Sequence, residues 1–203
     1  VRRYGEIDIK ISIVALGRLG VKQLTAGSDL DLLIVYDAAQ DSFSTGQRTL
    51  AAASYVLRLA QTMVSWISTP TAEGTLYDVD LRLRPEGKAG AIATSVDRLS
   101  VYFDRDAWIW EKQALTKARP IAGDAGLNDK IQRLINRIIN YDHPKDHLIK
   151  AISDMRQRLQ KQQKPASKWH LRQITGGLTD IDLLIHAWRL QHGRLFSGSG
   201  QPA

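Results

Sequence analysis

The sequence contains no cysteine, and this absence excludes disulfide frameworks and thiolate-bound metals. It also contains no apolar run that approaches the roughly 20 residues of a membrane-spanning helix, and no signal-peptide pattern opens the chain. Because the chain begins without methionine, we expect a piece of a longer, cytoplasmic polypeptide.

Histidine does not supply an alternative metal site, because the five histidines lie scattered: His143, His147, His170, His186 and His192. Pro144 separates the first two and favours a turn or a helix start over a helix interior. The stretch EGKAG contains Gly-Lys but lacks the spacing and the Ser/Thr of a P-loop. The chain also lacks the interleaved aromatic and basic residues typical of single-strand binding, which argues against a nucleic-acid partner.

What the sequence does contain is typical of a globular protein with an anionic partner. Its 203 residues are 43% hydrophobic and 24% charged, which is enough for one large domain or two small ones. The net charge of +7 favours nucleotide phosphates, nucleic acid or an acidic protein surface, and the charge alone does not choose among them.

The hydrophobic pattern predicts an α/β first half and a helical second half. The predicted strands are residues 9–16, 31–36, 75–83 and 91–95, with a turn at 17–20. The predicted helices are residues 48–67, 95–103, 107–119, 127–139, 148–163 and a closing helix from about 179. Residues 162–168 form the most linker-like stretch.

The stretch GSDLDLLIVYD leads from a turn into a buried strand and places two like charges at its start. Residues two apart in a strand share a face, so Asp29 and Asp31 project the same way. Such a pair raises each other's pKa unless a cation neutralises it, and Mg²⁺ suits carboxylate oxygens. Gly27 and Ser28 offer backbone freedom and a hydroxyl to a phosphate. A solvated strand end with a turn aspartate is the simpler alternative.

A second strand, YDVDLRLRP, carries charges on one face and apolar residues on the other. The charged face consists of Asp78, Asp80, Arg82 and Arg84. A solvent-facing edge strand also explains this pattern. In the functional interpretation Asp80 supplies a third carboxylate and acts as general base, while the two arginines hold phosphate oxygens. Asp78 is an alternative to Asp80, and it is also a salt-bridge partner for the arginines.

These motifs together resemble the DNA polymerase β-like nucleotidyltransferases. Four blocks are more specific: ALGRLGVKQLTAGSDLDLLIVYD, LYDVDLRLRPEGKAGAIATS, AWIWEKQALTKARPIAGD and GGLTDIDLL. They cover most of residues 14–184 in order and resemble the glutamine synthetase adenylyltransferase/adenylyl-removing enzyme family. The phrases EGTLYDVDLRLRP and DAWIWEKQAL look more like its C-terminal, adenylylating domain. Val21, Arg172 and Asp182 depart from the usual family residues.

The resemblance implies an α+β fold, with a mixed sheet and flanking helices followed by a mainly helical bundle. We expect a nucleotidyltransferase domain over 1–124, a helical segment completing the site over 125–196 and a disordered tail over 197–203. The implied reaction transfers AMP from ATP to a tyrosine of glutamine synthetase and so controls nitrogen assimilation. The alternatives are the family's phosphorolytic removal of AMP, and nucleotidyl transfer to RNA or a small molecule.

The resemblance also implies roles for individual residues. Asp29 and Asp31 would hold two Mg²⁺ ions, and Asp80 would bind one of them and help deprotonate the tyrosine. The implied phosphate-binding residues are Gly17, Gly27, Ser28, Arg82 and Arg84. The implied partners are ATP, glutamine synthetase and a PII-type signal protein that acts through other regions of the full-length enzyme.

Several further residues have open roles. Helical spacing predicts that Lys117 and Arg119 lie in the last turn of a helix, where cations are favourable. Glu111 either pairs with a basic residue or contacts substrate. One of residues 179–180 is expected to cap the final helix, and the family resemblance brings this loop, with its second acid Asp182, near the nucleotide.

Overall fold

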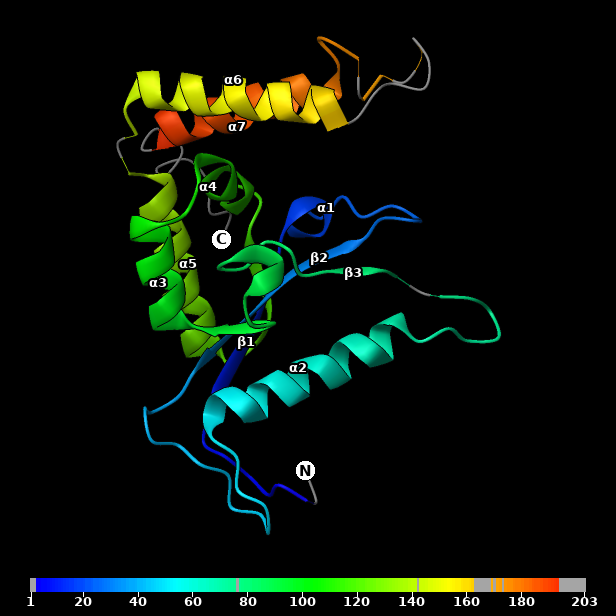
Figure 1. The fold of residues 1–203 in the computed structure, drawn as a ribbon, viewed down its shortest axis with the longest axis vertical. Helices are drawn as coiled ribbons and strands as arrows, with labels where there is room; N and C mark the ends of the chain where they lie inside the picture. Colours follow the sequence, from blue (N-terminus) through cyan, green and yellow to red (C-terminus); the bar gives the residue numbers. More distant parts are fainter. Residues whose placement is uncertain are drawn as a thin grey trace, which may run out of the picture. The chain divides into compact units, whose positions relative to one another are not determined.

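The computed structural model describes residues 3–75, 77–141, 143–162, 169, 171–172 and 174–193 (Figure 1). The predicted linker beyond residue 162, the predicted tail 197–203 and His170 lie outside these ranges. The chain divides into two compact units, Val1–Asp106 with Lys117–Leu134 and Ala107–Thr116 with Ile135–Ala203.

A mixed sheet forms the centre of the first unit, and it has five strands within the described residues. β1 pairs antiparallel with both β2 and β5, whereas β3 and β4 both pair parallel with β2. The strands are β1 (Lys10–Ala15), β2 (Leu30–Asp37), β3 (Val79–Asp80), β4 (Ala93–Ser95) and β5 (Arg119–Gly123). The predicted strands at 9–16, 31–36 and 91–95 are therefore confirmed.

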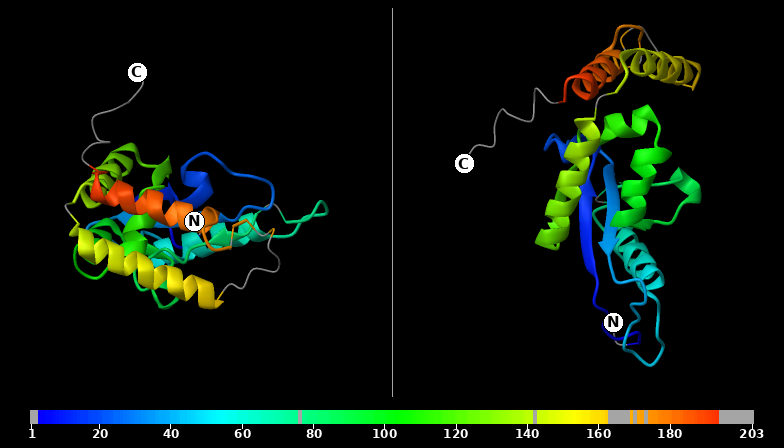
Figure 2. Two further views of the ribbon diagram at one scale, coloured as in Figure 1. Left: turned by 90° about the horizontal axis from the view of Figure 1, so that it is seen from above. Right: turned by 90° about the vertical axis from the view of Figure 1, so that its left-hand side faces the viewer.

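Helices cover both faces of this sheet, which explains the continuous apolar run in β2. α2 (Ala52–Ser68) lies on one face and the first part of α5 (Ala125–Ile139) on the other (Figure 2). The core beneath α2 consists of Leu32, Ile34, Val56, Ala60, Leu81 and Ala93. On the α5 side, Ser12 donates a hydrogen bond of 2.6 Å to Asn128. β2 is thus a rigid strand held from both sides.

The remaining helices of the first unit are short. They are α1 (Gly17–Gly20), η1 (Gly87–Ala89) and α3 (Val96–Arg105). The prediction of a simple turn at 17–20 is wrong, since these residues close one helical turn. The predicted helix from Ser95 is confirmed, and the Ser95 hydroxyl accepts the Arg98 amide as its cap.

The predicted strand 75–83 is much shorter in the structure, because β3 consists of Val79 and Asp80 alone. After these two residues the Asp80 carboxylate accepts the Arg82 backbone amide at 2.8 Å. That bond takes the place of a strand partner and turns the chain away from β2. The strand prediction was therefore right in type and wrong in length.

The predicted helix over 107–119 is wrong in its second half. α4 (Ile109–Leu115) ends before Thr116, and β5 begins at Arg119. Pro120 gives the physical reason, because it disfavours helical geometry in the residue before it and tolerates only an edge strand. Lys117 and Arg119 consequently do not occupy the last turn of a helix.

Within the residues that the structure describes, the regular elements of the second unit are all helices. It contains α4, the end of α5, α6 (Lys145–Gln162) and α7 (Leu178–Gln191), which confirms the predicted helical bundle. Polar side chains join α4 to α7: Gln113 donates to the Leu183 carbonyl at 3.3 Å, and Arg189 donates to the Thr116 carbonyl at 2.7 Å. Across the described ranges, no helix combines the length and apolar character needed to cross a membrane.

Truncation of Leu32 should test the central role of β2. Leu32 is 4% exposed within the core cluster, so Leu32→Ala should lower the free energy of unfolding by about 2–5 kcal/mol. Leu59→Ala is the matched control, because Leu59 lies on α2 of the same unit and is 46% exposed. Urea denaturation should show a loss under about 1 kcal/mol for the control. Equal losses in the two variants would contradict this account of the core.

Candidate active site

The pairing of β2 with β3 brings two of the predicted carboxylates together. Asp31 and Asp80 are register partners in this parallel ladder, although 49 positions separate them in the sequence. Neighbouring strands lie about 5 Å apart, so side chains at paired positions project from the same face. The Leu30 amide donates to the Asp78 carbonyl at 2.8 Å and fixes the register. Asp29 lies exposed just before β2, while Asp31 is half-buried.

The two paired carboxyls have opposite electrostatic environments. Burial raises the pKa of Asp31, and the nearby charges of Asp80 and Asp29 raise it further, against the opposing effect of Arg82 and Lys117. The hydrogen bond from Arg82 lowers the pKa of Asp80. Asp80 is therefore stable as an anion, whereas the Asp31 carboxyl beside it resists ionisation.

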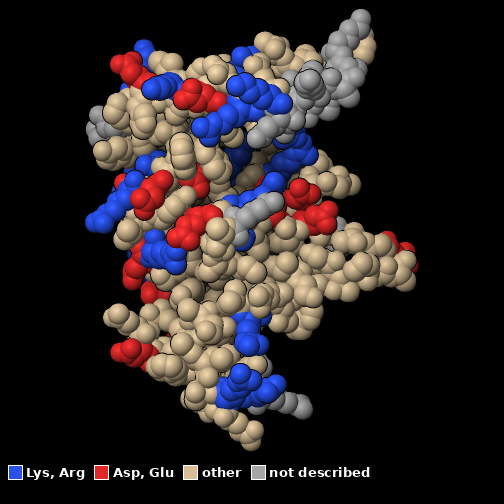
Figure 3. Space-filling model, in the orientation of Figure 1, with Lys and Arg blue, Asp and Glu red and all other residues tan. Residues whose placement is uncertain are grey.

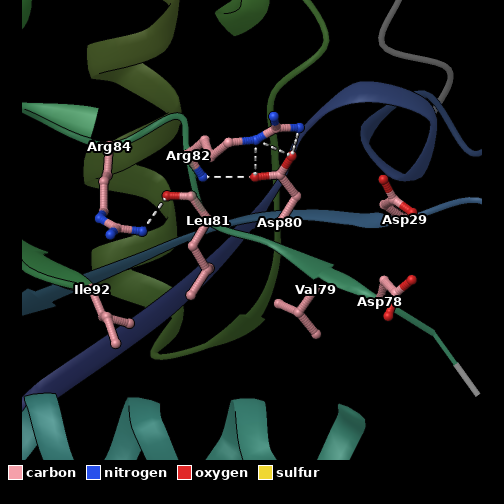
Figure 4. Close-up of a pocket in the computed structure, with 8 residues that line it drawn as sticks. All are labelled: Asp29, Asp78, Val79, Asp80, Leu81, Arg82, Arg84 and Ile92. Carbon is pink, nitrogen blue, oxygen red and sulfur yellow. Dashed lines mark hydrogen bonds and ion pairs between the residues drawn. The ribbon is translucent and has the colours of Figure 1, made fainter. Parts of the chain in front are cut away.

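Arg82 covers the carboxylate of Asp80 (Figure 4). Its Nε donates to Oδ1 at 3.0 Å and to Oδ2 at 2.7 Å, and its Nη2 forms an ion pair with Oδ2. The arginine thus pairs with Asp80 and not with Asp78, the partner weighed from the sequence. Because the Arg82 side chain is 69% exposed, it is free to rotate away from the acid toward another anion.

Arg84 points in a different direction from Arg82, although the sequence pattern placed both on one face (Figure 4). Its Nη1 donates to the Leu81 carbonyl at 2.7 Å and its Nε to the Gly90 carbonyl at 3.2 Å. These bonds hold together the turn that follows β3. In this structure Arg84 stabilises the loop through these bonds, and its charge helps to lower the pKa of Asp80.

The glycine and serine residues predicted for phosphate binding lie around the start of β2. Gly17 has a φ of +51°, and a Cβ added to it would lie 2.1 Å from Oδ2 of Asp31. Glycine is therefore required at this position both by its conformation and by the acid beside it. Gly27 also has a positive φ, but no other group lies within 4 Å of its added Cβ.

Ser28 is buried, and its hydroxyl belongs to a small network. It accepts the Thr25 amide at 3.2 Å, lies 2.8 Å from the Thr25 hydroxyl and accepts Nη1 of Arg18 at 3.3 Å. Arg18 also donates to the Thr25 hydroxyl at 3.0 Å. Arg18 was not among the predicted site residues, although a cation directly after the glycine of GRLG was a usable signal.

Arg18 differs from Arg82 in its partners. In the part of the chain that the structure describes, its guanidinium hydrogen-bonds to hydroxyls and pairs with no carboxylate. Neutral hydroxyls leave its positive charge uncompensated, so the charge remains available to an anion.

A pocket of about 470 Å³ lies beside the carboxylates (Figure 4). It is lined by Asp29, Asp78, Val79, Asp80, Leu81, Arg82, Arg84 and Ile92. Val79 and Ile92 pack against the core beneath α2 and give the pocket an apolar wall, opposite the charged rim. Figure 3 shows acidic and basic side chains side by side around β3, whereas the surface over α2 carries little charge. A partly apolar pocket with a charged rim suits a nucleotide.

The donor set fits a hard divalent cation, even though the described residues contain no cluster of three histidine or acidic side chains that could hold a metal alone. Asp31 and Asp80 offer carboxylate oxygens, and their mutual repulsion is the condition that a cation relieves. Mg²⁺ needs few protein ligands, because it commonly shares its shell with substrate phosphates and water.

Two acids of the second unit have structural partners. Glu111 is buried, and its carboxylate accepts the Trp108 amide at 2.8 Å, which caps α4. Asp180 accepts two bonds from Arg156, at 2.9 and 2.8 Å, and the Gly176 amide at 2.7 Å. The bond from Arg156 is the main cause that lowers the pKa of Asp180.

The predicted cap of the final helix is wrong. α7 has Gly177 at its N-cap position, and neither residue of 179–180 provides the cap. Asp180 instead holds the turn before the helix through the Gly176 amide. Its proximity to a nucleotide, and that of Asp182, stays a prediction.

The mixed sheet with its paired acids, glycine-serine loop and flanking helices defines a nucleotidyltransferase-type domain. The sequence model of the family "Glutamate-ammonia ligase adenylyltransferase" matches residues 2–134. The chain belongs to this family.

Relatives agree with the family assignment. The "Bifunctional glutamine synthetase adenylyltransferase/adenylyl-removing enzyme" of Brucella suis biovar 1 (strain 1330) is 38% identical over 185 residues. The protein of the same description from Bartonella quintana (strain Toulouse) is 37% identical over 184 residues. Each match covers 90% of this chain and 19% of the relative, so the chain spans about a fifth of the length of these curated relatives.

The raised pKa of Asp31 predicts a pH-dependent stability difference. The folded protein binds this proton more tightly than the unfolded chain does, so stability falls as the pH rises past the ordinary value of 3.8. Without divalent cations, the wild type should lose unfolding free energy relative to Asp31→Asn as the pH rises through the acidic range above 3.8. Urea denaturation across this range measures the difference, and a constant difference would show that folding does not perturb Asp31.

Proposed function

We propose that this chain transfers AMP from ATP to a tyrosine of glutamine synthetase, as the adenylylating domain of a longer enzyme. The observation that carries the proposal is the in-register pair of Asp31 and Asp80, of which Asp80 lines the pocket beside β3. The family match and the relatives' descriptions support the same chemistry. Every residue used in the proposal lies within the predicted domain 1–124.

The reaction requires that the tyrosine phenol attack the α-phosphate of ATP in line with the departing pyrophosphate. Asp29, Asp31 and Asp80 would hold the Mg²⁺ ions, whose chemistry is to neutralise the triphosphate and polarise its oxygens. The apolar β2 strand keeps Asp31 fixed during this exchange of partners.

Cationic and backbone groups of the chain would bind the phosphates. Gly17, Gly27 and Ser28 offer the loop that approaches them, and Arg18 adds the charge that the loop itself lacks. Arg82 already binds one anion in Asp80, so a phosphate can compete for the same guanidinium. Arg84 would join only after it leaves the carbonyls that it now holds.

Movement of Arg82 would also prepare the base. While Arg82 donates to Asp80, it lowers the pKa of that carboxyl and makes it a weak proton acceptor. Transfer of Arg82 to a phosphate removes this effect, and the Asp80 oxygen then accepts the phenol proton more readily. Asp78 is the alternative base, although it lies exposed one position before β3.

The proposed substrates are ATP and glutamine synthetase, and their nature implies a cytoplasmic reaction that controls nitrogen assimilation. A PII-type signal protein would act through regions of the longer enzyme that this chain does not contain. The relatives' descriptions also name adenylyl removal. In that reaction, inorganic phosphate would attack the AMP on tyrosine, restore the phenol and leave as ADP.

Incubation with ATP, Mg²⁺ and glutamine synthetase tests the proposal by intact mass. The wild type should add one AMP unit per modified tyrosine, and Asp31→Asn and Asp80→Asn should each slow the transfer at least about a hundredfold. Asp129→Asn is the matched control, since Asp129 lies exposed on α5 away from these acids. Release of ADP from adenylylated glutamine synthetase, without transfer from ATP, would assign the removing reaction. Equal rates in all variants would contradict a role for the acid pair.

A further inference from the structure

The helix α1 connects the candidate site to β5, and it is too short to be stable by itself. It has four residues, whereas isolated helices need on the order of 12 or more to persist in water. No side chain caps its N-terminus. The backbone amides of residues 21–23 bond the carbonyls of Gly17, Arg18 and Leu19. The Gly20 carbonyl, at the end of the helix, takes its partner from a distant part of the chain.

Arg119 supplies the partner of the Gly20 carbonyl and a second donor to the Leu19 carbonyl, which also accepts the Lys22 amide. Its Nε donates to the Gly20 carbonyl at 3.0 Å, and its Nη2 donates to the Leu19 carbonyl at 3.3 Å. The planar guanidinium presents both donors at once, and its positive charge is favourable at the carboxyl end of a helix. Arg119 is itself fixed, because it pairs with Ala15 where β5 joins β1.

Steric contacts leave α1 little room at either end. A Cβ on Gly20 would lie 1.8 Å from the Lys117 carbonyl oxygen, and a Cβ on Gly17 would lie 2.1 Å from Oδ2 of Asp31. The helix therefore fills the space between the start of β5 and the carboxylate of Asp31. Arg18, in the same turn, reaches the Ser28 hydroxyl.

We propose that Arg119 is a positioning residue for nucleotide binding. It holds α1 so that Gly17 stays against Asp31 and Arg18 stays against Ser28, and it does so without touching the nucleotide. This inference rests on the proposed function, because it takes the surface around Asp31 and Ser28 as the nucleotide site. It gives the arginine of the TKARP stretch a role that its local sequence pattern does not reveal.

Calorimetric titration with ATP and Mg²⁺ tests the proposal, because it measures the dissociation constant and the fraction of competent sites separately. Arg119→Ala should weaken ATP binding about tenfold or more, with the fraction of competent sites unchanged. Arg119→Lys should lie between Arg119→Ala and the wild type, since an ammonium lacks the planar fork that meets two carbonyls. Arg98→Ala should bind as the wild type does, because Arg98 is exposed and pairs with Glu86 on the surface.

Amide hydrogen exchange supplies a second readout that needs no ligand and no activity. In Arg119→Ala the amides of residues 16–23 should exchange faster, while those of β2 keep the protection of the wild type. A purely structural role would instead reduce the fraction of competent sites at an unchanged dissociation constant, and that result would overturn the proposal. So would unchanged exchange over 16–23. A wild type that binds ATP but transfers no AMP would contradict the proposed function and leave the role of Arg119 intact.

Discussion

The structure depends on the pairing of β2 and β3, which holds two like charges side by side at Asp31 and Asp80. Packed helices fix β2 on both faces, so the strand cannot relax to separate the acids. The repulsion remains in the structure as the raised pKa of Asp31, which burial causes first and the neighbouring acids second. A site of this kind favours any cation that can reach both carboxylates.

The protein partly neutralises the pair with its own side chains. Arg82 binds Asp80 closely, and the charge of Lys117 acts on Asp31 from the segment before β5. Because Arg82 is mostly exposed, its ion pair contributes little stability and is easily exchanged for another anion. In the proposed reaction the same guanidinium would exchange the Asp80 carboxylate for a phosphate of ATP.

The parts of the fold with strong local patterns were predictable from the sequence. β1 and β2 follow from apolar runs between turn residues, and α2 follows from its helical stripe. The candidate carboxylates could also be identified from the sequence, because strand alternation determines which residues share a face. That alternation did not show that Asp80 would stand directly opposite Asp31, since pairing between distant strands leaves no local pattern.

The missed features depend on contacts that are distant in the sequence or on single residues. The alternation of polar and apolar residues over 75–83 continues past Asp80 in the sequence. The strand nevertheless ends at Asp80, whose carboxylate accepts the Arg82 amide. β5 was not predicted, and its first residue, Arg119, was assigned to the end of the preceding helix. The bonds of Arg119 to α1 cross about a hundred positions, and no periodicity indicates them. For Arg84, strand alternation predicted the same face as Arg82. In the structure its side chain points in another direction and donates to the Leu81 carbonyl.

We propose that Asp31 and Asp80 together bind a divalent cation with the nucleotide. Electron paramagnetic resonance of Mn²⁺, titrated in the presence of a non-hydrolysable ATP analogue, measures this binding directly. Tight binding should be seen in the wild type and in Asp129→Asn, and it should be lost in Asp31→Asn and in Asp80→Asn individually. Retention of the wild-type affinity in both single variants would contradict the account.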